Sequence, residues 1–158
     1  MLTLLLALSL SGAPATPAEH PLTAFMLQPD RVQIFLADME HLDEKPAKKD
    51  RRPRVHGFVF TRAGPELKEE EHQALAKTWV SPEDTRPTQP TRCIFNPDIA
   101  LRFLHGNAWV DAVVCFGCRE IMFFDTKGNS INGGSFRDLE PIRKLAVKAF
   151  PKEDFRGE

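Results

Sequence analysis

Tyrosine is missing from this chain of 158 residues, and cysteine occurs only three times. The formal net charge is only −1, so no excess of one sign attracts nucleic acid, and we expect no nucleic-acid partner. No apolar run is long enough to span a bilayer, which predicts no membrane span in the mature chain. Gly-x-Ser-x-Gly, His-Glu-x-x-His and phosphate-loop motifs are also missing. These absences favour a non-enzymatic protein and leave its function open.

The N-terminal residues have a pattern of their own. Leu2–Leu10 is a short apolar run without charge, and small residues and prolines follow it. This order is typical of a secretory signal, so we predict a signal peptide at 1–18 with cleavage after Ala15 or Ala18. No cysteine lies near either cleavage point, so we expect no lipoprotein. The mature chain would be periplasmic or extracellular, whereas translation from Met26 would leave it cytoplasmic.

Hydrophobic periodicity predicts an α+β protein. Alternating or β-branched stretches predict strands at 30–38, 54–64, 99–104, 109–116 and 120–125. Apolar stripes with suitable N-terminal residues predict helices at 64–82 and 135–150. The segment 126–134 is interpreted as a turn-rich return. The order is ββαβββα, and we expect a single domain over 19–158 with an antiparallel meander sheet and both helices on one face.

The most specific local prediction is a hairpin with Gly106-Asn107 as its two-residue turn. This turn pairs His105 with Ala108, and it places Arg102 opposite Asp111 as a cross-strand ion pair. The other face of the hairpin collects apolar side chains, which are Ile99, Leu101, Phe103, Val110, Ala112, Val114 and Phe116. We expect that face to form the core beneath the helices.

Extending this register brings Cys93, Cys115 and Cys118 to one end of the hairpin. A structural disulfide is the first interpretation, joining Cys93 to Cys118 with Cys115 as the alternative partner, because nearby thiols pair outside the cytosol. Zinc bound by all three cysteines is the second, with a fourth ligand from His56, His72 or His105. A redox pair is the third, although a strand follows Cys118 where redox-active Cys-x-x-Cys motifs begin a helix.

The stretches CIFNPDIALRF and VVCFGC, within residues 93–118, resemble a pattern in small bacterial exported proteins and lipoproteins. The shared pattern is a cysteine, an aromatic residue, a proline, an apolar strand and Cys-Phe-x-Cys. Members of that group often follow the proline with a basic residue and His or Asn, where this chain has Asp98 and Ile99. The resemblance implies a shared structural core and no particular activity.

These patterns predict an exported small globular protein with a binding or structural role, no cofactor, and a central hairpin stapled by a disulfide. The alternative is a thiol or zinc-binding protein that uses Cys93, Cys115 and Cys118 directly. The two hypotheses predict different states of the sulfurs. A structural disulfide leaves one free thiol and no metal, whereas a zinc site built on all three cysteines leaves three thiols and one bound zinc.

Overall fold

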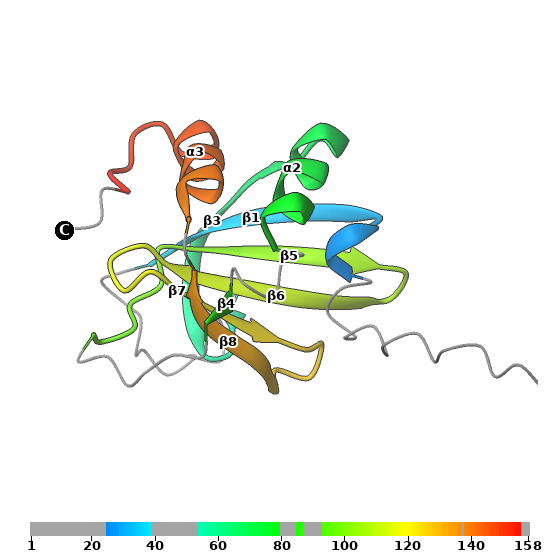
Figure 1. Cartoon of the computed structure of the whole chain (residues 1–158), viewed down its shortest axis with the longest axis horizontal. Helices are drawn as coiled ribbons and strands as arrows, with labels where there is room; N and C mark the ends of the chain where they lie inside the picture. Colours follow the sequence, from blue (N-terminus) through cyan, green and yellow to red (C-terminus); the bar gives the residue numbers. More distant parts are fainter. Residues whose placement is uncertain (1–24, 39–53, 80–84, 87–92, 137, 156–158) are drawn as a thin grey trace, which may run out of the picture.

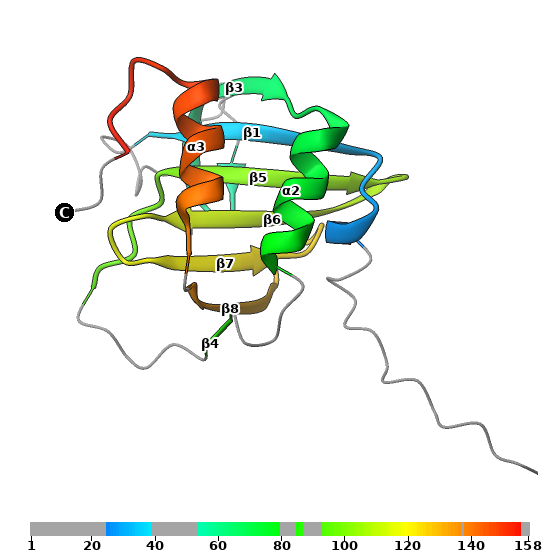
Figure 2. The same ribbon diagram turned by 45° about the horizontal axis from the view of Figure 1, so that its top comes forward.

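The computed structural model describes residues 25–38, 54–79, 85–86, 93–136 and 138–155. These residues form a curled, eight-stranded antiparallel sheet with helices packed on one face (Figure 1 and Figure 2). The α+β class predicted from the sequence is therefore confirmed. The predicted signal peptide at 1–18 lies outside the described residues. Within the described part of the chain, no helix is long and apolar enough to cross a membrane.

The sheet has the strand order β2-β3-β1-β5-β6-β7-β8-β4. The strands are β1 (Arg31–Ala37), β2 (Arg54–Val55), β3 (Phe58–Glu66), β4 (Thr85–Arg86), β5 (Ile99–His105), β6 (Ala108–Cys115), β7 (Glu120–Phe124) and β8 (Ser130–Phe136). The helices are α2 (Glu69–Trp79) and α3 (Glu140–Ala149), and one helical turn at 25–27 precedes β1. The meander continues from β5 to β8, and β1 pairs with β5 although β2, β3, α2 and β4 lie between them in the sequence.

The predicted order ββαβββα is incomplete, because the structure contains additional strands. Residues 54–64, predicted as one strand, turn back at His56 and Gly57 and form the β2–β3 hairpin. Both turn residues have a positive φ, 47° and 87°, which suits a tight two-residue turn. Residues 126–134, predicted as a return, contain most of β8, whose pairing with β7 makes it a strand.

Helix α2 begins at Glu69, later than the predicted start at Gly64, because Gly64 belongs to β3. A β-carbon on this glycine would lie 2.7 Å from the Ile34 Cγ2 atom and 2.8 Å from the Phe150 Cζ atom. Those separations are shorter than real β-carbon contacts, so both side chains depend on glycine to approach the sheet here. Pairing with β1, in which Gln33 lies opposite Glu66, keeps the chain extended until β3 ends at Glu66.

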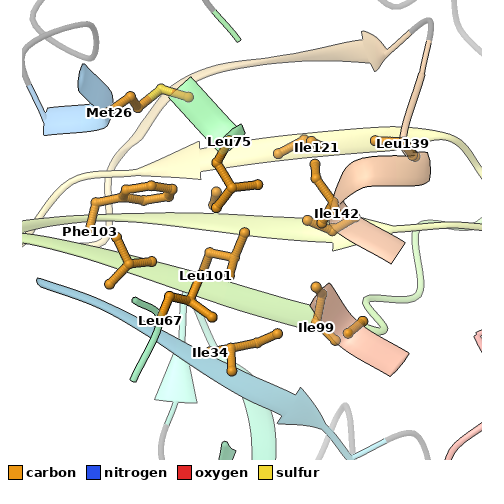
Figure 3. Packing of buried hydrophobic residues seen from close by; sticks show 14 of the residues in the cluster. Met26, Ile34, Leu67, Leu75, Ile99, Leu101, Phe103, Ile121, Leu139 and Ile142 are labelled. Atoms are coloured by element: carbon orange, nitrogen blue, oxygen red, sulfur yellow. The ribbon is translucent and has the colours of Figure 1, made fainter. Parts of the chain in front are cut away.

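The main hydrophobic core lies between the sheet and the two helices (Figure 3). Leu101 and Phe103 of β5 are fully buried there, with Leu75 of α2 and Ile142 of α3 packed over the sheet. The predicted core face of the β5–β6 hairpin is confirmed, since all its members belong to this core: Ile99, Leu101, Phe103, Val110, Ala112, Val114 and Phe116.

The sheet curls so that its own β2–β3 edge packs against its opposite face, an arrangement that the predicted meander does not contain. Val55 and Phe60 of the hairpin join a second buried cluster with Ala37, Ala100, Val113 and Phe124. At the hairpin tip, the His56 ring stacks on the Phe124 ring with centroids 4.2 Å apart. The His56 Nδ1 atom lies 2.8 Å from the Gly128 carbonyl oxygen, which fastens the tip to the β7–β8 turn.

Candidate functional site: the cysteine corner

The predicted β5–β6 hairpin is present with the predicted register. Arg102 faces Asp111 and donates to it twice, from Nε to Oδ1 at 2.7 Å and from Nη2 to Oδ2 at 2.9 Å. The three cysteines gather at the end of this hairpin that lies away from the Gly106 turn. We call this region the cysteine corner, and it comprises the segment 93–98, Cys115 at the end of β6, and the turn 116–119.

A disulfide joins Cys93 to Cys118, with Cα atoms 5.7 Å apart. Cys93 is exposed in the irregular segment before β5, and Cys118 lies in the turn between β6 and β7. The Cys118 sulfur also lies 3.2 Å from the Ile94 carbonyl oxygen. The bridge therefore ties the chain that enters β5 to the turn that leaves β6, which is the staple that the sequence predicts.

The turn that carries Cys118 is a tight hairpin connection. The Arg119 N–H donates to the Phe116 carbonyl oxygen at 3.2 Å, and Arg119 has a φ of 56°. A left-handed residue at the end of such a turn lets the chain re-enter a strand. Strand β7 accordingly begins at Glu120, which pairs with Cys115. Cys115 and Cys118 are thereby held close together at one end of the strand pair.

Cys115 remains a thiol and is only 4% exposed. Its sulfur accepts the Cys118 backbone N–H at 3.3 Å. Burial raises the pKa of the Cys115 thiol, and the Asp98 carboxylate adds to the rise. The backbone N–H groups of Cys118, Asn96 and Gly117 act in the opposite direction on this pKa. Because the thiolate is the reactive form, Cys115 is a weak nucleophile at neutral pH.

Asp98 links the corner to strands β6 and β1, although sequence reasoning assigned it no role. The Oδ2 atom of Asp98 accepts the Phe116 N–H at 2.7 Å. The Asp98 backbone N–H donates to the Val114 carbonyl oxygen at 2.8 Å, and the Asp98 carbonyl oxygen accepts the Ala37 N–H at 2.9 Å. Burial raises the pKa of this carboxyl, whereas the Phe116 N–H and the Arg143 guanidinium lower it. The available signal was an aspartate directly before a strand, where such side chains often bind turn N–H groups.

We expect Asp98→Asn to change the pH dependence of stability. A carboxyl whose pKa is higher in the folded than in the unfolded protein binds more protons when folded, so its contribution to stability falls as the pH rises. Asparagine retains an oxygen for the Phe116 N–H and carries no charge. The variant should therefore gain stability relative to wild type as the pH rises above about 4, as measured by urea unfolding at each pH.

Asp125→Asn is the matched control for that experiment. Asp125 lies in the β7–β8 turn, where hydrogen bonds from Asn129 and Lys127 lower the pKa of its carboxyl. Its stabilising contribution is present above the unfolded pKa and is lost as the pH falls. This variant should therefore lose stability relative to wild type as the pH rises. A pH-independent difference for the Asp98 variant would contradict the raised pKa.

The histidines required by the zinc hypothesis lie away from the cysteine corner. His56 is at the tip of the β2–β3 hairpin, and the Nε2 atom of His72 lies 2.7 Å from the Leu67 carbonyl oxygen. His105 is at the opposite end of the β5–β6 hairpin, 3.7 Å from the Asp30 carboxylate. Among the residues that the structure describes, no group of three or more His, Cys, Asp or Glu side chains is arranged to hold a metal.

Two open clefts flank the corner. The first has a volume of about 370 Å³ and lies between the turn 116–119 and the start of α3, where Arg143 stacks over the Phe116 ring with its Cζ atom 5.2 Å from the centroid. The second has a volume of about 440 Å³ and lies between the end of β1 and the chain after α3, with Asp98 in its lining. The disulfide therefore fixes one wall of the first cleft.

No protein-family model, curated protein or solved structure matches this chain. What the protein does must therefore be argued from the chemistry of the cysteine corner. The resemblance of residues 93–118 to small bacterial exported proteins stays a prediction.

Proposed function

We propose that this protein is an exported, non-enzymatic domain with a binding or structural role, held in shape by the Cys93–Cys118 disulfide. The observation that carries this proposal is that the three sulfurs are in different chemical states. Two are bonded to each other, and the third is buried with a raised thiol pKa. Covalent thiol catalysis uses an accessible sulfur with a lowered pKa. The sulfur chemistry of this corner is thus suited to holding the fold.

The disulfide is also the structural feature that supports export. Paired cysteines persist in the periplasm and outside the cell, and they are rare in the cytosol, where thiols are kept reduced. The apolar run at the N-terminus points to the same compartment. A cytoplasmic chain that starts at Met26, the alternative, would be expected to keep Cys93 and Cys118 as thiols.

A binding role would use the surface that the disulfide holds in place. The turn 116–119 and the start of α3 form the two walls of the 370 Å³ cleft. Phe116 and Leu139 line this cleft but are almost fully buried, so charged groups of both signs make up most of its exposed lining: Arg119, Asp138, Glu140 and Arg143. Ligand pockets commonly combine apolar walls with a few polar groups that orient the ligand. This cleft has the polar groups but little apolar wall, so a small ligand that carries charges of both signs fits its lining.

The test is the intact mass of the full-length gene product exported from a bacterial host, alkylated in denaturant with and without a reductant. We expect a shortened N-terminus, one alkylated cysteine without reductant, and all three after reduction. A chain that keeps its N-terminus would contradict export. Three alkylated cysteines without reductant would contradict the disulfide, and one zinc ion per chain would then favour the alternative that Cys93, Cys115 and Cys118 bind metal.

A further inference from the structure

We propose that the cysteine corner is a thiol–disulfide exchange centre, in which Cys115 displaces Cys93 from its bond to Cys118. This inference rests on the same disulfide as the proposed function and goes beyond it. The staple then opens without an external reductant, and Cys93 becomes the accessible thiol of the chain.

The geometry of the segment 94–96 places the sulfurs together. Its first carbonyl oxygen, that of Ile94, lies 3.2 Å from the Cys118 sulfur. The backbone N–H of Asn96, the last residue of this segment, donates a hydrogen bond to the Cys115 sulfur. The Cys115 sulfur also accepts the Cys118 N–H at 3.3 Å. One short segment therefore contacts the sulfurs of both Cys115 and Cys118, and the free thiol lies beside the residue that carries the disulfide.

Backbone donors around Cys115 offset part of the cost of its anion, while burial and Asp98 keep the pKa of the thiol raised. Three backbone N–H groups act on its sulfur, those of Cys118, Asn96 and Gly117. Hydrogen bonds from N–H groups stabilise a thiolate more than a thiol. Burial and the Asp98 carboxylate keep the thiol as the major form. The expected behaviour is a slow exchange from a small thiolate population.

The exchange step balances within the protein. Cys115 releases its proton to solvent, and its sulfur attacks the Cys118 sulfur. A Cys115–Cys118 bond forms while the Cys93–Cys118 bond breaks, and Cys93 leaves with the bonding electron pair and takes up a proton. One disulfide and one thiol are present before and after the step, so neither an oxidant nor a reductant is consumed.

Cys93 is the partner that can move away. It is exposed, it lies outside the strands, and its neighbour Ile94 is 80% exposed. Cys115 belongs to the central strand β6, and Cys118 follows in the tight turn, so both are held by the sheet. The native disulfide closes the longer loop and is the more stabilising of the two. The exchanged form is therefore the minor form, and it has to be trapped to be seen.

The experiment incubates the oxidised full-length protein under native conditions with iodoacetamide and locates the label by non-reducing peptide mapping. Alkylation of released Cys93 is irreversible, so the minor form accumulates. We expect label on Cys93 together with a Cys115–Cys118 disulfide. The Cys115→Ser variant should keep the Cys93–Cys118 disulfide and lose all labelling of Cys93, and Cys115→Ala provides the same comparison if the serine variant does not fold.

Each other outcome overturns the exchange. Label on Cys115 with the Cys93–Cys118 disulfide intact, or no label on Cys93 after a week, removes the exchange and leaves the proposed function standing. Label on Cys93 in the variants that lack Cys115 shows that the disulfide opens by another route. A chain without the Cys93–Cys118 disulfide before incubation overturns the exchange and the proposed staple together.

Discussion

Replacing Cys93 and Cys118 together with serine should lower the free energy of unfolding by about 3.5 kcal/mol. The two cysteines are separated by 25 residues. Closing a loop of that length removes conformational entropy from the unfolded chain, which is the main source of disulfide stabilisation in the chain-entropy model. The double replacement also prevents Cys115 from pairing with a remaining cysteine. Urea unfolding of both proteins, followed by circular dichroism, measures the difference.

Cys115→Ser is the matched control for this loss. A serine hydroxyl at this buried position can accept the Cys118 N–H that the thiol sulfur accepts. We therefore expect a loss of about 1 kcal/mol or less. Wild type in the presence of a strong dithiol should approach the double variant. Equal losses for the double variant and for Cys115→Ser would contradict the pairing of Cys93 with Cys118.

Arg102→Met should lower the free energy of unfolding by about 3 kcal/mol, because it leaves the Asp111 carboxylate buried without its cation. The Asp111 side chain is 5% exposed, whereas that of Arg102 is 26% exposed, which places the loss at the lower end for broken buried pairs. The Arg102 guanidinium lies near two rings, with Cζ 5.6 Å from the Phe35 centroid and 4.9 Å from the Trp109 centroid. Methionine retains much of this packing, so the loss reports mainly on charge.

The pH dependence and a second replacement separate charge from packing. Burial raises the pKa of Asp111 and the Arg102 hydrogen bonds oppose the rise, so removing Arg102 should raise this pKa further. The stability lost on Arg102→Met should therefore shrink at acid pH, where Asp111 is protonated in the folded and the unfolded forms of both proteins. Arg102→Met combined with Asp111→Leu should recover most of the stability. A double variant as unstable as the single one would contradict the electrostatic origin.

The β5–β6 hairpin was predictable because its register depends on short-range geometry. A two-residue turn at Gly106-Asn107 determines which residues face each other on the two strands. Strand alternation then assigns each side chain to one face. The Arg102–Asp111 pair, the core face beneath the helices, and the approach of Cys93 to Cys118 all follow from these two rules.

Two of the elements that were missed, strand β8 and the β2–β3 hairpin, are not identified by their own residues. Strand β8 contains Gly133 and Gly134, which are poor strand formers, and it becomes a strand by pairing with β7. The sequence of the β2–β3 hairpin is typical of one continuous strand. In the structure the chain turns at its tip, where His56 contacts Phe124 and Gly128. Both outcomes depend on partners that are distant in the chain.

The sequence by itself determined the α+β class, the central hairpin and the convergence of its cysteines at one end, because turn residues and hydrophobic periodicity act over a few residues. Only the tertiary structure decided that the sheet curls and packs its β2–β3 edge against its opposite face. It also decided that Cys115 is the buried thiol and that Asp98 binds the turn after β6. These features depend on contacts between segments that are far apart in the chain. Burial that results from such contacts leaves no local pattern in the sequence.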